Sequence, residues 1–406
     1  MAPDSPSMNN SPENQPMPPP KSPWWPLFVV GTGVIGALLL VRWAALTPVR
    51  PQAGGAAQAS GEDGETDWMI AKETLGAFDR GNASAEVYST LWTRLTGAAQ
   101  DSVEQGPEQT RRFLKALFYA LDERTPGDRL AVLGGFFETQ VDVDLGLPFV
   151  PAADGSLSSW PTLRVALFDY LSTRDVAATG VLADSWIRSR PGAAAEWAVA
   201  LRELAAGQSA SEWPPPVREC VSLLLKNETW AGAPPPGWAE ALDAIAAGQA
   251  VEFLPELSRF AQRDQPRETQ QAAHAVLEAL MTTAPRRVLE AINLDTSLFA
   301  QTSGLRAAIC ARADVRVPEQ FRALEVYLSR PDVMPGERAQ FTAQFPYHRM
   351  SVMPRLLTAV PAQTPEDVAA QDAATVAQID RWRGDASFRA WWEALEKIRA
   401  RLVARH

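Results

Sequence analysis

Three glycines near the N-terminus have the spacing of a nucleotide-binding turn. Gly31, Gly33 and Gly36 form the pattern G-x-G-x-x-G in the stretch VVGTGVIGALLL, between two apolar runs. In a dinucleotide-binding unit this turn joins a strand to a helix, and an acidic residue about 20 residues later, after a second strand, holds the ribose. No second strand follows here, and the first acidic residue after the glycines is Glu62. The pattern therefore does not predict a nucleotide site.

Histidine, the commonest general base, is rare in this chain. His274 lies in QQAAHAVLEAL beside an apolar helix face, so we expect a packing role for it. His348 stands in a turn, in FPYHRM, with no carboxylate close to it in the sequence, and His406 is the last residue. None of the three is predicted to be catalytic.

Metal-binding and nucleophilic patterns are also sparse. Asp142 and Asp144 in VDVDLG could offer hard oxygen ligands, but no third ligand follows, so we expect a solvated face. Cys220 and Cys310 are far apart and lack metal-site spacing, which leaves two buried thiols or one disulfide as alternatives. The G-x-S-x-G, H-E-x-x-H, Walker and C-x-x-C patterns are missing from the sequence. We expect no catalytic, metal-binding or cofactor-binding residues, and no cofactor.

Residues 24–46 read as a membrane-spanning helix. The run contains one charged residue, Arg42, and at about 1.5 Å per residue it spans about 34 Å, enough for a hydrocarbon core of roughly 30 Å. Trp24 and Trp25 stand at one end and Trp43 at the other, where aromatic rings settle at the lipid headgroups, and Arg42 can extend toward water. The segment predicts a single-pass anchor in contact with the lipid bilayer.

The glycines of this segment acquire a second meaning in lipid. Gly33 and Ala37, like Thr32 and Gly36, are small residues four apart, the spacing that allows two membrane helices to approach closely. The competing interpretation is that glycine is simply common in membrane helices. A cleaved signal peptide is the other alternative, because GAAQAS offers small residues downstream.

The flanking segments differ in composition from the rest of the chain. Residues 1–23 are rich in Pro, Ser and Asn and predict a disordered tail, while residues 47–66 have the composition of a flexible linker. Residues 67–406 remain for one large domain, with a subdivision near 143–159 as the alternative.

The overall charge excludes one class of partner. The net charge is −10 and the estimated pI is near 5.0, so the chain as a whole is not expected to bind nucleic acid electrostatically. Arginine greatly outnumbers lysine, which favours a GC-rich bacterial source.

Apolar spacing after residue 67 is almost uniformly helical. In RRFLKALFYALDE, one predicted helix face carries Phe113, Leu114, Leu117, Phe118 and Leu121. Thr125 and Thr364 each precede a proline and a carboxylate in the pattern of a helix start. Further prolines predicted to begin helices are Pro107, Pro161, Pro266 and Pro335. We expect an all-α domain of roughly sixteen to eighteen helices; only residues 139–143 alternate, in a loop-like zone that ends near Ser159.

One pair of segments is internally similar. WAVALRELAAGQSA (197–210) and WAEALDAIAAGQAV (238–251) share Trp, Ala, Leu, Gly and Gln positions at an offset of 41 residues. The pair, over residues 197–251 only, resembles the helical repeats of HEAT and armadillo proteins, in which neighbouring helix pairs bury each other's apolar faces. The resemblance implies a solenoid-like or irregular helical array; a compact bundle is the alternative.

The C-terminal segment FRAWWEALEKIRARLVARH reads as a basic amphipathic helix. Its predicted apolar stripe consists of Phe388, Trp391, Trp392, Leu395, Ile398 and Leu402. Its other face carries Arg389, Lys397, Arg399, Arg401 and Arg405. Phe388, Trp391 and Trp392 are candidate partner contacts, because aromatic residues anchor protein interfaces; the alternative is that the helix closes the domain with this stripe buried.

Together these patterns predict a protein that works by binding. We expect a single-pass membrane-anchored helical scaffold, or an accessory subunit of a larger membrane complex, with integral-membrane protein partners and no small-molecule substrate. The alternative is an anchored envelope hydrolase with a carboxylate site in a helical groove. The expected location is a bacterial inner membrane, with the large domain periplasmic and a cytoplasmic domain as the alternative.

Overall fold

The computed structural model describes residues 85–139, 141–152, 154–189, 192–348, 356–358 and 362–405. All of them belong to the unit Ala56–His406. The predicted tail, membrane segment and linker, residues 1–66, lie outside the described residues. Within the described residues, every helix is too short or too polar to cross a membrane.

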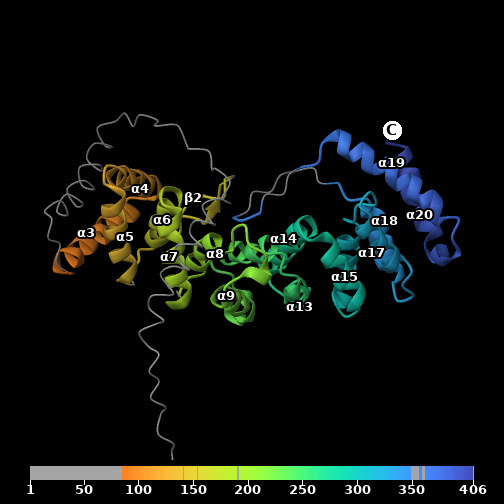
Figure 1. Ribbon diagram of the computed structural model, residues 1–406, viewed down its shortest axis with the longest axis horizontal. Coiled ribbons are helices and arrows are strands. Elements are labelled where there is room, and N and C mark those ends of the chain that lie inside the picture. Colours follow the sequence, from red (N-terminus) through yellow and green to blue (C-terminus); the bar gives the residue numbers. More distant parts are fainter. Residues whose placement is uncertain are drawn as a thin grey trace, which may run out of the picture. The chain divides into compact units, whose positions relative to one another are not determined.

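The described part of the chain is predominantly helical, as the apolar spacing predicts (Figure 1). The helices before residue 206 are α3 (Ala85–Glu104), α4 (Pro107–Asp122), α5 (Pro126–Glu138), α6 (Leu163–Arg174), α7 (Val176–Ser189) and α8 (Ala194–Ala205). The middle helices are η1 (Ala210–Glu212), α9 (Pro215–Lys226), α10 (Glu228–Gly232), α11 (Trp238–Ala241), α12 (Asp243–Ala247), η2 (Val251–Phe253), α13 (Leu254–Phe260) and α14 (Arg267–Thr283). The last helices are α15 (Pro285–Leu294), η3 (Ala300–Thr302), α16 (Ser303–Cys310), α17 (Pro318–Leu328), α18 (Pro335–Gln344), α19 (Pro365–Trp382), η4 (Ala386–Trp391) and α20 (Trp392–Val403).

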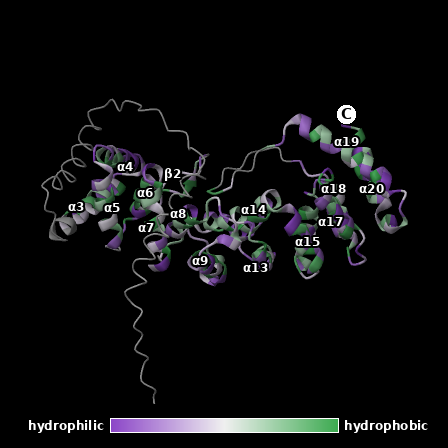
Figure 2. Cartoon of the chain, in the orientation of Figure 1, coloured by the Kyte–Doolittle hydropathy of each residue, from purple (hydrophilic) through white to green (hydrophobic). Residues whose placement is uncertain are grey.

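The amphipathic helix predicted from RRFLKALFYALDE is α4. Its predicted apolar face is buried, except that Phe118 is half-buried against the core. Hydrophilic and hydrophobic residues also mix along many of the other helices (Figure 2), whereas α6 and α8 are buried along most of their length. The amphipathic helices depend on their neighbours to cover one face, since they gain most of their stability from that packing.

Both predicted threonine caps are confirmed. The side chains of Thr125 and Thr364 accept a hydrogen bond from the backbone N–H three residues later, at the start of α5 and α19. Of the prolines predicted to begin helices, Pro107 and Pro335 occupy the first position of α4 and α18. Pro266 is the N-cap of α14, and Pro161 lies two residues before α6, whose N-cap is Thr162.

Helix packing follows the order of the chain. The most extensive contacts join α7 with α8, α8 with α11, α12 with α14, α15 with α17, and α16 with α18. Each of these pairs is separated by no more than four steps in the element order. Neighbours along the chain thus supply most of the surface that buries each helix.

The two similar segments adopt related but unequal conformations. Trp197 lies in the continuous helix α8, whereas Trp238 begins α11, which a turn at Leu242 separates from α12. The backbone turns left-handed at Gly207 in the first segment and one position later, at Gln249, in the second. The segments pack directly against each other, through α8 and α11.

The loop-like zone before α6 contains a small antiparallel hairpin. Its strands are β1 (Val150–Pro151) and β2 (Leu157–Ser159), and an isolated bridge joins Asp144 to Thr162. Thr139 ends α5 instead of beginning a strand. Buried residues of this zone, Leu157 among them, belong to the same continuous core as the helices on either side.

Candidate interaction surfaces and buried polar clusters

A buried arginine joins the hairpin to two helices. Arg202 of α8 donates from Nη1 to Asp169 Oδ1 of α6 at 2.5 Å and to the carbonyl of Gly155 at 3.1 Å. Its Nη2 donates to Ser172 Oγ at 2.6 Å and its Nε to Glu203 at 2.8 Å. Arg202 is fully buried, so these partners replace the water that its guanidinium gives up.

The second oxygen of Asp169 completes this cluster. Asp169 Oδ2 accepts hydrogen bonds from the Leu157 backbone N–H at 3.1 Å and from Trp160 Nε1 at 2.8 Å. One carboxylate thus holds α8 and strand β2 together. Local sequence could not reveal the cluster, because its members come from three separate elements.

A second buried cluster surrounds Arg164 at the start of α6. Its Nε donates to Glu196 at 2.6 Å, and its guanidinium lies 4.9 Å from the centroid of the Trp186 ring. Burial raises the pKa of Glu196 and of Asp142, although Arg164 opposes both shifts. Carboxyl groups with a raised pKa are one mark of an acid catalyst. Here, however, Arg164 donates to Glu196 through its side chain and to Asp142 through its backbone N–H, so both carboxyl groups have structural partners.

The two aspartates that resembled a metal corner have structural partners. Asp142 accepts hydrogen bonds from the backbone N–H groups of Val143 and Arg164, and Asp144 accepts one from Gly146 N–H at 2.9 Å. Within the described ranges, no three metal-ligating side chains come together.

A third cluster stabilises the C-terminal helices. Arg306 of α16 forms a bidentate pair with Glu337 of α18, with both N–O distances 2.7 Å. Tyr327 donates to the same carboxylate at 2.9 Å, and burial together with Glu337 raises the pKa of this phenol. The cluster therefore links α16, α17 and α18 through one buried carboxylate.

Both cysteines are free and buried, so the disulfide alternative is wrong. Burial raises the pKa of each thiol above its usual range. The thiolate is the nucleophile and the metal ligand of cysteine chemistry. Cys220 and Cys310 accordingly remain protonated at neutral pH.

We expect the native protein to react slowly with a thiol-specific disulfide reagent. The rate should be at least roughly tenfold below that of the unfolded chain, because each unit of pKa lowers the thiolate fraction about tenfold. Both thiols should react once denaturant is added. Under the same conditions, the Cys220→Ser and Cys310→Ser variants should each consume one equivalent of the reagent, because one thiol remains in each. Rapid labelling of the native chain would contradict the assigned burial.

His348 is the histidine whose surroundings the sequence did not reveal. Its Nε2 lies 2.8 Å from Asp372 Oδ1 on α19, and Arg405 Nη1 lies 3.0 Å from its Nδ1. Burial lowers the pKa of His348, which Asp372 partly opposes. Near pH 7 the ring is therefore neutral, and it fills the space between α19 and the end of α20. His274, by contrast, is exposed beside the buried stripe Ala273, Val276, Leu277 and Leu280, as predicted.

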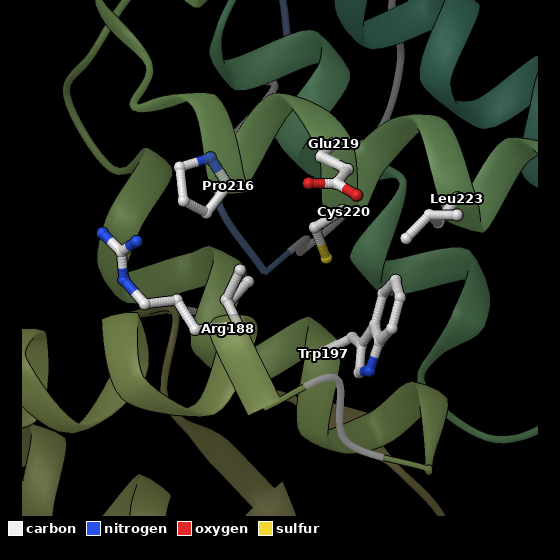
Figure 3. Close-up of a pocket in the computed structure, with 7 residues that line it drawn as sticks. Arg188, Trp197, Pro216, Glu219, Cys220 and Leu223 are labelled. Atoms are coloured by element: carbon white, nitrogen blue, oxygen red, sulfur yellow. The ribbon is translucent and has the colours of Figure 1, made fainter. Parts of the chain in front are cut away.

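A small pocket lies where α7, α8 and α9 meet (Figure 3). It encloses about 170 Å³ and is lined by Ile187, Arg188, Trp197, Pro216, Glu219, Cys220 and Leu223. Pockets for small-molecule ligands are larger, about 300–1,000 Å³. The lining combines the exposed side chains of Arg188 and Glu219 with apolar groups and a neutral thiol, and most of the lining surface is polar.

The three aromatic residues predicted as C-terminal partner contacts do not share one face. Phe388 and Trp391, at 5% and 1% exposure, are core residues, and Trp391 packs edge-on against Phe341. Trp392 is 38% exposed. The stripe breaks because residues 386–391 form the 3-10 helix η4 and α20 begins only at Trp392.

Most of the predicted basic face is engaged within the domain. Arg399 pairs with Asp380 at 2.7 Å and Lys397 with Glu393 at 2.7 Å. Arg401 donates to the carbonyls of Thr342 and Ala343 at 2.8 Å, at the end of α18. Arginine on the last carbonyls of a helix satisfies groups that have no partner within the helix. This face serves mainly to close the domain.

An open groove of about 690 Å³ borders α17 and the start of η4. It is lined by Arg322, Glu325, Val326, Ser329, Arg330, Pro331, Asp385 and Phe388. Val326 is 53% exposed, and the Phe388 ring packs 5.8 Å from the Trp382 ring. An apolar residue beside exposed charged groups is the composition of a contact surface.

The predicted membrane residues lie outside the described ranges. They are Thr32, Gly33, Gly36 and Ala37 of the proposed packing face, and Trp24, Trp25, Arg42 and Trp43 of the two ends.

Comparison with protein-family models, curated proteins and solved structures finds no match to this chain.

Proposed function

We propose that this protein is a membrane-anchored helical scaffold, or an accessory subunit of a larger membrane complex, which acts by protein–protein contact. The packing of each helix on near neighbours in the chain carries the proposal. Helical repeat proteins share this property, and their stacked helices form extended binding surfaces. We therefore take the domain as a solenoid-like or irregular helical array, with residues 24–46 as its anchor.

The groove beside α17 is the contact surface that we assign to this array. It combines the exposed side chain of Val326 with Arg322, which makes no ion pair within the described residues. Phe388 gives the groove an aromatic wall. We expect an integral-membrane partner to place an apolar residue against Val326 and an acidic residue near Arg322.

The envelope-hydrolase alternative has less support. It requires two facing carboxyl groups in a cleft, one acting as an acid. The two carboxyl groups with a raised pKa, Asp142 and Glu196, both bind Arg164, and neither lines the pocket or the groove described above. Their hydrogen bonds favour a structural role.

The predicted anchor also suggests where the helical array is located. An N-terminal span with a large following domain most often leaves that domain translocated, so we assign the array to the periplasmic side of a bacterial inner membrane. Tethering at the bilayer raises the effective concentration of the array toward membrane partners.

Extraction in mild detergent, followed by size separation, tests the proposal. The native protein is expected to migrate with a stoichiometric integral-membrane complex, and Gly33→Leu with Gly36→Leu is expected to release it, because bulky side chains prevent close helix approach. The matched control is Gly54→Leu with Gly55→Leu, outside the predicted span. Migration of the native protein as a lone monomer would refute the subunit assignment.

A further inference from the structure

His348 contacts a charged group through each of its two ring nitrogens. Its Nε2 lies 2.8 Å from Asp372 Oδ1 on α19, and its Nδ1 lies 3.0 Å from Nη1 of Arg405, which follows the end of α20. The His348 side chain is 9% exposed and the Asp372 side chain 1%, so the ring meets the carboxylate largely away from water. Arg405 Nη1 also lies 3.7 Å from Asp372 Oδ2. The three side chains therefore form one compact cluster between α19 and the end of α20.

The contact with Arg405 fixes the protonation state of the ring. A guanidinium has N–H donors and no acceptor, so the contact requires a lone pair on His348 Nδ1. The neutral imidazole has one proton, which then lies on Nε2, the nitrogen that faces Asp372. A second proton would have to occupy the position on Nδ1 to which the Arg405 N–H now points. Protonation of the ring and the Arg405 contact thus exclude each other.

The charged groups around His348 come from α19, from α20 and from the residues after α20. Burial lowers the pKa of His348 most, Arg405 and Arg401 lower it further, and Asp372 partly opposes them. On the side of α14, Glu278 accepts a hydrogen bond from the tyrosine that precedes His348, at 2.9 Å. Because the folded-state pKa lies below the ordinary value of 6.5, the stability contributed by the neutral ring is present above about pH 6.5 and declines as the pH falls.

We infer that His348 is a pH-sensitive latch on the last turn of α20: the neutral ring holds Arg405 and closes this turn onto α19, and the imidazolium releases it. Protonation leaves the Nε2 proton facing Asp372, so this contact survives in both states. The imidazolium repels Arg405, whose half-exposed side chain can move into water. Arg401 still donates to carbonyls at the end of α18, so the preceding turn stays in place. Acidification therefore loosens the last turn alone.

The latch acts on the helix that ends the described array. Besides the latch, α20 packs on α18 and α19. Its last turn is closed by hydrogen bonds from the Ala404 N–H to the Ala400 carbonyl at 3.1 Å and from the Arg405 N–H to the Leu402 carbonyl at 3.2 Å. These two amides therefore report the state of the latch. The inference is independent of the proposed membrane partner, because every group in it belongs to this chain.

Nitrogen NMR of the full chain in mild detergent, with isotope-labelled histidine rings, tests the protonation state. The chain has three histidines, and His348→Gln assigns the signal. At neutral pH the His348 ring is expected to carry its proton on Nε2, with a titration midpoint below the ordinary value of about 6.5. Arg405→Gln should raise the midpoint by about 1 pH unit, because it removes a positive charge beside the ring. Arg389→Gln, at an exposed arginine on η4, is the matched control and should leave it unchanged.

Two results of this titration would overturn the inference. One is a proton on Nδ1 of the neutral ring, since Arg405 could not then donate to it. The other is a midpoint that Arg405→Gln and Arg389→Gln shift equally, since the Arg405 contact would then not oppose protonation.

Hydrogen exchange of the Ala404 and Arg405 amides tests the release itself. Their protection factors, which correct for the intrinsic effect of pH on exchange, are expected to fall about threefold or more between about pH 7.5 and about pH 5. His348→Gln keeps an acceptor and a donor but does not titrate, so its protection should be the same at both pH values. His406→Gln removes the other titratable ring near this turn in the sequence and should behave as the native chain. Constant protection in the native chain, or an equal fall in His348→Gln, would overturn the inference.

Discussion

Replacing Arg202 with methionine is expected to lower the free energy of unfolding by about 3–5 kcal/mol. The substitution keeps an unbranched apolar stem but leaves the buried Asp169 carboxylate without its charged partner. It also removes the donors to Ser172 and to the Gly155 carbonyl. Urea unfolding of the full chain, followed by circular dichroism, measures the change.

Arg286→Met is the matched control for this substitution. Arg286 pairs with Glu290 at 3.1 Å on α15, but both side chains are at least half exposed. Exposed pairs of this kind contribute about 0–1 kcal/mol, because water screens them. Equal losses in the two variants would show that burial of Arg202 does not determine its contribution.

Local features of this fold were predictable from sequence, and long-range pairings were not. The apolar face of α4 and the caps at Thr125 and Thr364 depend on residues within a few positions of each other. The contact between Asp243 and Thr358 joins residues 115 apart, so periodicity carries no information about it.

The C-terminal stripe shows how a local pattern can mislead. A single helix through Phe388, Trp391 and Leu395 would align all three residues, and Phe388 and Trp391 are indeed buried. Trp392 follows Trp391 directly, and successive residues on a helix point about 100° apart, so with Trp391 at the centre of the buried stripe Trp392 lies at its edge, where it is 38% exposed. The 3-10 turn of η4, capped by Asp385, then offsets α20 from the residues before it.

The resemblance between the two similar segments is also only partly structural. The tryptophans that begin them, Trp197 and Trp238, are both buried, and both pack edge-on against another aromatic ring. What the sequence pattern could not predict is how closely the segments approach each other, since this depends on one residue just outside the pattern, Gly237.

Gly237→Ala is expected to destabilise the protein by about 2–5 kcal/mol. Gly237 has a left-handed φ of +84°, which costs a residue with a Cβ about 1–2 kcal/mol. Its added Cβ would lie 2.5 Å from Ala195 Cα and 2.9 Å from Ala195 N, so α8 and α11 would have to separate. Overpacking of this kind typically adds about 1–3 kcal/mol.

Gly207→Ala separates the two contributions to that loss. Gly207 has a similar φ of +71°, but a Cβ there would meet nothing within 4 Å. Its substitution should therefore cost only the strain of placing a residue with a Cβ in the left-handed region, about 1–2 kcal/mol. Urea unfolding of both variants measures the difference, which reports the close packing of α8 on α11. If Gly237→Ala proved no more destabilising than Gly207→Ala, the two helices would not be in the close contact that joins the similar segments.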